Sequence, residues 1–145
     1  MLVRGKWRFA AGALIGIASW MIGFLALGIL LAQVWPEYAI HGRAWMQEGV
    51  FTFTPPMAVC NLLFWAIADV LAGWLAAMIA GTGSATRIVA LLLTGYLALM
   101  HFVLNWELFP WWYNVGVVLP AFPATILGGR LARRFATASG NPGRA

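Results

Sequence analysis

Asp69 is the residue of this sequence best placed to do chemistry in an apolar environment. It is the only charged residue in the run 56–80. An ionised carboxylate at the centre of a bilayer costs at least about 2.5 kcal/mol, and such residues usually face the interior of a helix bundle, where they serve an ion pathway or a proton relay. No Lys or Arg stands near its depth in any apolar run. We therefore expect Asp69 to be a neutral acid or to hold a bound cation.

His101 is the second titratable residue inside an apolar run. If the runs 56–80 and 88–106 form neighbouring antiparallel helices, a rise of about 1.5 Å per residue separates His101 and Asp69 in depth by about 3 Å or about 11 Å, depending on which helix ends are level. Direct pairing is one alternative, and a hydrogen-bonded histidine near a helix end is the other. Neutral polar residues complete the predicted proton or ion site: Ser19, Thr94, Asn105 and Thr125.

Motifs for other chemistry are missing from the sequence. It has no P-loop, no GxSxG elbow and no dinucleotide fingerprint, and its histidines and acidic residues lack the tight spacing of metal ligands. Cys60 is the only cysteine, so no intramolecular disulfide can form. We therefore predict no cofactor and no metal, and an enzyme would have to rely on Asp69 and His101 alone.

The elements that must position these residues are membrane-spanning helices. The 145 residues are 63% hydrophobic and 9% charged, whereas soluble domains are roughly half apolar and a quarter charged. A spanning helix needs about 20 mostly apolar residues, and four runs are long enough: 10–34, 56–80, 88–106 and 113–131. We predict a single all-α domain over 1–136, a four-transmembrane-helix bundle built from two helical hairpins. The loop 35–55 suits a helix lying in the outer interface, and 137–145 reads as a disordered tail.

The basic residues give the predicted direction of the helices. Arg43 alone falls on one side of the four runs, and eight basic residues fall on the other: Arg4, Lys6, Arg8, Arg87, Arg130, Arg133, Arg134 and Arg144. The positive-inside rule then places both termini in the cytoplasm of a bacterial-type inner membrane. The net charge of +5 follows from this topology and from anionic lipid, so the lipid bilayer and not nucleic acid is the predicted partner.

Small residues indicate how the helices pack. Helices associate in lipid where backbones approach closely, so glycines mark the contact faces. Five glycines are assigned to helix packing: Gly12, Gly16, Gly23, Gly73 and Gly128. Pro120 and Pro123 lie inside the fourth run, and each removes a backbone hydrogen bond and kinks the helix. This bend is either a fixed shape or a hinge for gating.

Three functions are compatible with these features. The first is a small inner-membrane protein of accessory or binding type that assembles with itself or with a larger membrane complex. The alternative is a small oligomeric transporter or channel that uses Asp69 as its proton or ion site. A remote alternative is an intramembrane enzyme that acts on a lipid-soluble substrate.

The topology leads to a direct test with reporter fusions. Fusions after Thr82 and after Ala136 are expected to report a cytoplasmic location, and a fusion within 42–49 an external one, because the basic residues hold their segments inside. An external location for the fusion after Ala136 would contradict the four-span arrangement.

Overall fold

The computed structural model describes residues 2–138, without the side chains of residues 2–4 and 46. The described chain is all-helical: α1 (Leu2–Val34), α2 (Pro36–Glu48), α3 (Pro55–Ala80), α4 (Gly83–Ala98), a π-helical segment η1 (Leu99–Leu104), a 3-10 turn η2 (Trp106–Leu108) and α5 (Trp111–Ala138). Four helices are long and apolar enough to cross a membrane, namely α1, α3, α4 continued by η1, and α5. The predicted all-α membrane fold with four long apolar helices is confirmed.

The ends of these helices differ from the predicted boundaries by up to eight residues, because α1 begins at Leu2 and not at residue 10. The loop predicted to hold an interfacial helix contains α2, whose 13 residues end at Glu48. Helix α5 continues to Ala138, so the first two residues of the predicted disordered tail are helical. The rest of that tail, 139–145, lies outside the described residues.

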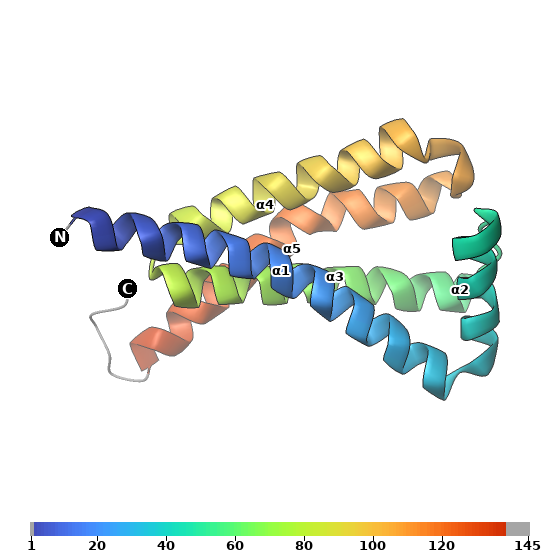
Figure 1. Ribbon diagram of the computed structural model, residues 1–145, viewed down its shortest axis with the longest axis horizontal. Coiled ribbons are helices and arrows are strands. Elements are labelled where there is room, and N and C mark those ends of the chain that lie inside the picture. Colours follow the sequence, from blue (N-terminus) through green and yellow to red (C-terminus); the bar gives the residue numbers. More distant parts are fainter. Residues whose placement is uncertain (1, 139–145) are drawn as a thin grey trace.

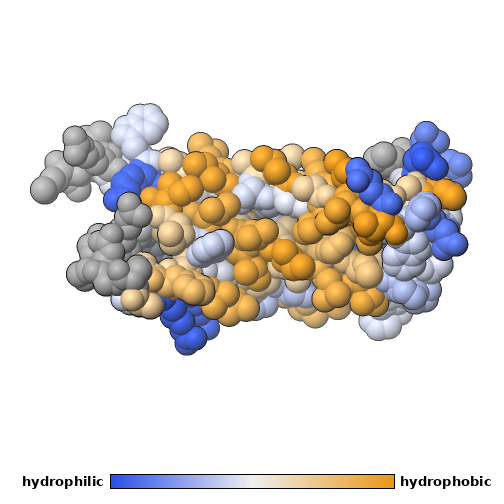
Figure 2. Space-filling view, turned by 90° about the horizontal axis from the view of Figure 1, so that it is seen from below, coloured by the Kyte–Doolittle hydropathy of each residue, from blue (hydrophilic) through white to orange (hydrophobic). Residues whose placement is uncertain are grey.

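The long helices lie side by side, and α2 crosses one end of them (Figure 1). The start of α1 and the last turns of α5 lie at the opposite end, and α1 diverges from the other long helices as it approaches α2. Hydrophobic residues form a band along the middle of the face shown in Figure 2, and hydrophilic residues gather at its two ends. This distribution fits a bundle whose middle faces lipid.

Proline and glycine residues set the helix boundaries. Both α2 and α3 carry proline in the first turn, where a missing N–H breaks no helical bond. Gly49 and Gly81 follow α2 and α3 with φ of 68° and 67°, a left-handed conformation that glycine adopts without strain. The Gly81 N–H donates to Ala77 O at 2.9 Å, which completes the last turn of α3 before the chain reverses into α4.

Helix α3 is the centre of the bundle, and its closest neighbour on one side is α1. A Cβ on Gly12 would lie 2.8 Å from the Ala76 carbonyl oxygen, and one on Gly16 would lie 3.0 Å from the Ala72 carbonyl oxygen. Gly23 is looser, with only a methyl group at 4.0 Å. The glycine stripe of α1 is therefore used inside the chain, against alanines of α3, and its contact loosens toward α2.

The contact between α3 and α5 is tighter still. A Cβ on Gly73 would overlap the Thr125 carbonyl oxygen, and one on Gly128 would overlap the Val70 carbonyl oxygen. A Cβ on the adjacent Gly129 would lie 2.6 Å from the Thr86 hydroxyl of α4. The backbones of α3 and α5 thus meet at this level, with a side chain of α4 packed beside them, and only glycine permits so close an approach.

Prolines shape the part of α5 that leads to this contact. Pro120 and Pro123 lie within the continuous helix, and Figure 1 shows α5 changing direction along its length. The missing N–H groups leave the carbonyls of Gly116 and Leu119 without their usual helical donors. A role of this bend as a hinge remains a prediction.

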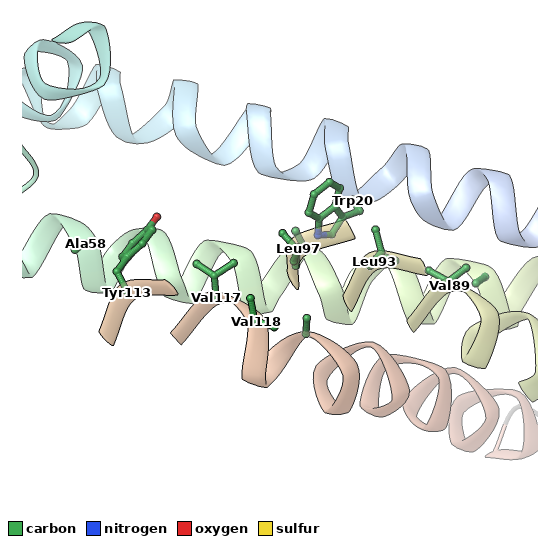
Figure 3. Packing of buried hydrophobic residues seen from close by; sticks show 12 residues of the cluster. Trp20, Ala58, Val89, Leu93, Leu97, Tyr113, Val117 and Val118 are labelled. Atoms are coloured by element: carbon green, nitrogen blue, oxygen red, sulfur yellow. The ribbon is translucent and has the colours of Figure 1, made fainter. Parts of the chain in front are cut away.

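Side chains between the helices form a core that follows α3. Val89, Leu93 and Leu97 face inward from α4 at intervals of one helical turn. Trp20 reaches down from α1 beside Leu97, and Tyr113 rises from α5 near the end that α2 covers (Figure 3).

Two glycine substitutions test this packing. Gly128→Ala is expected to lower the free energy of unfolding by about 3 kcal/mol, the upper end of the usual cost of overpacking, because the new methyl meets backbone that cannot move aside. The matched control is Gly95→Ala on α4, where nothing lies within 4 Å; it is expected to be neutral or to stabilise by up to about 1 kcal/mol. Thermal unfolding in mild detergent measures both, and equal effects would contradict the α3–α5 contact.

Candidate functional site

The Asp69 carboxyl lies inside the bundle near the middle of α3. The residue is fourteen positions from the start and eleven from the end of the helix, about 21 Å and about 17 Å at the helical rise. It is 1% exposed, and neither carboxyl oxygen forms a hydrogen bond with any described residue. Since buried polar groups are nearly always paired, this carboxyl is the most unusual polar group of the described chain.

Two tryptophans form the surroundings of the carboxyl. The Trp20 indole N–H, from α1, interacts with the Asp69 carboxyl, although the two do not complete a hydrogen bond of normal geometry. Trp65 lies one turn before Asp69 on the same face of α3, and its ring centroid is 5.2 Å from that of Trp20. Its indole N–H is also buried and unpaired. The carboxyl therefore has one indole N–H beside it, that of Trp20, in a layer of aromatic rings.

Further aromatic rings hold the tryptophans in place. Phe24 stacks on Trp65 at 4.0 Å, and Tyr96 meets Trp20 edge-on at 6.0 Å. Sequence reasoning did not assign Trp20 to the site. The available signal was its position, four residues after Gly16, which puts a large polar-tipped ring at the end of the glycine stripe.

The hydroxyl groups predicted around Asp69 have other roles. Ser19 donates to the Gly16 carbonyl oxygen at 2.8 Å, and Thr125 donates to the Ala121 carbonyl oxygen at 2.8 Å. Both bonds stay within the residue's own helix, a common alternative for short hydroxyl side chains. The Thr94 hydroxyl is buried without a partner. None of the three forms a hydrogen bond with Asp69.

His101 pairs with Asn114 and not with Asp69. The π-helical segment η1 directs His101 into the bundle; such segments often occur at functional positions. Nδ1 of His101 is 2.9 Å from Oδ1 of Asn114, whose Nδ2 donates to the Trp106 and Phe109 carbonyl oxygens at 3.2 and 3.4 Å. Because Oδ1 can only accept, the His101 Nδ1 carries the proton and donates.

Trp65 lies between the two titratable groups. Its ring contacts that of Trp20 on one side and that of His101 on the other, with centroids 6.3 Å apart in the second pair. Asn105 lies beyond His101 in the turn after η1, where its N–H donates to Met100 O and its carbonyl accepts from Leu108. Its side chain forms no hydrogen bond within the described residues, so it belongs to the turn and not to the Asp69 site.

A second polar group lies where α2 covers the bundle. The Tyr38 hydroxyl of α2 donates to Oδ1 of Asn61 on α3. Burial raises the pKa of the Tyr38 phenol, and the hydrogen bond to Asn61 opposes this rise in part, so the phenol remains a donor at neutral pH. The Tyr113 phenol of α5 interacts with both Asn61 and the Trp65 indole. Aromatic rings of the loop and of the α5 start enclose this group: Phe51, Phe53 and Phe109.

Neither a cluster of metal ligands nor a known relative indicates what the site does. Within the described residues, no three His, Cys, Asp or Glu side chains gather as metal ligands do. Comparisons of the chain with protein-family models, curated proteins and solved structures find no match. The chemistry of the site must therefore be argued from its own residues.

The His101–Asn114 pair gives a testable contribution to stability. Asn114→Ala leaves the His101 donor and two backbone carbonyls unpaired, which costs about 1–3 kcal/mol for each buried group. Asn105→Ala removes the same side chain from a position where that side chain forms no hydrogen bond, and is expected to change stability little. Thermal unfolding in detergent compares the two, and a harmless Asn114→Ala would show that the His101 pairing is absent in the folded protein.

Proposed function

We propose that the chain is a small integral membrane protein of the binding type, and that Asp69 is the group that binds. The site takes up a proton or a cation, as in a small oligomeric transporter or channel. One observation carries the proposal: a carboxyl buried halfway along α3 has neither oxygen hydrogen-bonded within the described residues. A group held in this state at such cost is usually functional in a membrane.

A purely structural role accounts less well for this geometry. A carboxyl that joins helices would pair with donors on its neighbours, as Asn114 does with His101. The hydroxyls of Ser19 and Thr125 are engaged with their own helices, and the nearby indole N–H groups do not close a hydrogen bond. The Asp69 carboxyl oxygens therefore remain available to bind a proton or a cation.

The proposed orientation places the two helical hairpins with both termini in the cytoplasm of a bacterial-type inner membrane. It is supported by the basic residues near the start of α1, the start of α4 and the end of α5, and by Arg8, which donates to the Ile79 carbonyl oxygen near the end of α3 at 3.3 Å. Helix α2 then lies on the outer side, and Asp69 lies between the two sides of the membrane.

Assembly with itself or with a larger membrane complex is the second candidate function. The observation that favours it is an exposed apolar face of α4 around one glycine that contacts nothing within the chain. Gly95 has nothing within 4 Å, and Leu91, Leu92 and Leu99 are exposed around it on α4. An enzyme is not proposed, because Trp65 lies between Asp69 and His101, the one acid–base pair on which catalysis would rely.

Two substitutions of Asp69 separate binding from structure. Asp69→Asn is expected to fold and melt like the parent, because the amide fills the same space, yet to lose proton- or ion-dependent flux, because it cannot release a proton or neutralise a cation. Asp69→Leu removes the polar group altogether and is expected to lose flux as well. The measurements are thermal stability in detergent and flux in reconstituted vesicles.

Flux or growth phenotype at the parent level in both variants would show that Asp69 does not bind, and would favour the assembly function.

A further inference from the structure

Buried polar side chains are distributed unevenly above and below Asp69. Toward α2 the bundle contains several of them, on four different elements: Tyr38, Asn61, His101, Tyr113 and Asn114. Toward the chain ends the buried polar side chains among the described residues are Thr86 and Thr125. Buried side chains that can form hydrogen bonds therefore lie on the α2 side of Asp69, and few lie on the side of the chain ends.

The polar side chains toward α2 form a continuous series. Tyr38 bonds to Asn61, and Tyr113 interacts with Asn61 and with the Trp65 indole. Trp65 packs on Trp20, whose N–H interacts with the Asp69 carboxyl. On α3 itself the series is Asn61, Trp65 and Asp69, spaced four residues apart and thus on one face of the helix. Groups of this kind can hydrogen-bond water that enters between them.

Toward the chain ends, α3 and α5 pack backbone against backbone one turn below Asp69. There Gly73 meets the Thr125 backbone, and the Thr86 hydroxyl donates to the Gly73 carbonyl oxygen at 3.3 Å. The Thr125 hydroxyl is likewise bonded to a backbone carbonyl, so neither hydroxyl is free to pass on a proton. Contacts of Gly12 and Gly16 with alanines of α3 continue the closed region toward the chain ends.

The surroundings of the carboxyl favour a proton over a metal cation. An indole N–H donates and cannot accept, so Trp20 and Trp65 supply no ligand to a metal. Small hard cations take six or more oxygen ligands, whereas no three His, Cys, Asp or Glu side chains gather as metal ligands within the described residues. A proton needs one carboxyl oxygen and no additional space.

The titratable groups near this region are few and none is a permanent cation. From α4, Tyr96 contacts Trp20; from η1 and α5, His101 and Tyr113 lie beyond Trp65; from α2, Tyr38 lies beyond Asn61. Among the described side chains, no Lys or Arg donates a hydrogen bond to Asp69.

From this arrangement we infer that the Asp69 site takes a proton, and that the proton reaches it from the α2 side of the membrane and not from the side of the chain ends. Trp65 and Trp20 are the last members of the series before the carboxyl, and their rings form the barrier on this path. The inference rests on the proposed binding role of Asp69 and adds the ligand and the side of entry.

The experiment uses the fact that Asp69 is the only aspartate of the sequence. The full chain is labelled with aspartate carrying 13C at the side-chain carboxyl, and is reconstituted in vesicles of one orientation. The pH is then stepped on one side while the other side is strongly buffered, and the labelled carboxyl is followed by time-resolved infrared difference spectroscopy. Protonation is expected to follow a step on the α2 side at least about tenfold faster, a barrier difference of about 1.4 kcal/mol.

Variants on the two sides of the carboxyl serve as matched tests. Tyr113→Phe and Asn61→Leu each remove one polar group of the outer series and are expected to slow the response to a step on the α2 side. Thr86→Val, in the closed region, is expected to leave that response unchanged. Tyr113→Phe keeps the ring and its packing, so it remains informative if Asn61→Leu folds poorly.

Each remaining outcome contradicts a distinct part of the inference. An equal or faster response to a step on the side of the chain ends overturns the side of entry while the proposed binding role stands. A carboxyl signal that shifts with Na⁺ or K⁺ at constant pH overturns the choice of a proton. A signal that responds to neither pH nor cations on either side removes the proposed function and this inference together.

Discussion

Backbone contact along α3 is the constraint on which the rest of this structure depends. Lipid tails are as apolar as leucine, so helices in a bilayer are held together by close packing and not by the hydrophobic effect. Gly73 and Gly128 bring α3 and α5 within backbone contact, and Gly12 and Gly16 do the same for α3 and α1. With these contacts fixed, α3 becomes the axis of the bundle, and residues on its inner face are kept away from lipid. The burial of Asp69 follows from its position on that axis.

The glycine contacts with backbone carbonyls are confined to one half of the bundle, and this division gives the molecule its two different ends. Beyond Asp69, α1 moves away from α3, and larger side chains fill the widening space: Trp20, Phe24 and Trp65. Aromatic rings are suited to this position because they pack as apolar groups and carry a polar atom at one edge. Within this layer the Trp20 indole N–H interacts with the Asp69 carboxyl. A tight, backbone-to-backbone half and a looser aromatic half therefore meet at the carboxyl.

The parts that could be predicted from the sequence are those that depend on local properties. Four long apolar helices follow from runs of apolar residues, and the glycines of α1 could be assigned to packing from their spacing alone. The surroundings of Asp69 could not be derived in this way, because they depend on the crossing of the helices and on their relative depth. Ser19 and Thr125 stand at suitable depths yet bond to carbonyls three and four residues earlier, and the π-helical segment changes the direction of His101 relative to regular helical counting. Trp20 lies beside Asp69 because α1 packs against α3, and this packing cannot be derived from the local sequence around Trp20.

The most direct test of this account measures the neighbours of the Asp69 carboxyl in a bilayer. Because the sequence has a single aspartate, solid-state NMR with a 13C label at the aspartate carboxyl and 15N labels in chosen side chains detects contacts of this group alone. The account predicts magnetisation transfer between the carboxyl carbon and tryptophan indole nitrogen, and none to arginine or lysine nitrogen. The tryptophan signal is expected to disappear in Asp69→Asn prepared with the same labels, since the labelled carboxyl is then gone. A contact with arginine or lysine nitrogen would contradict the account, because it would mean that Asp69 is neutralised by a permanent ion pair and has no capacity to bind.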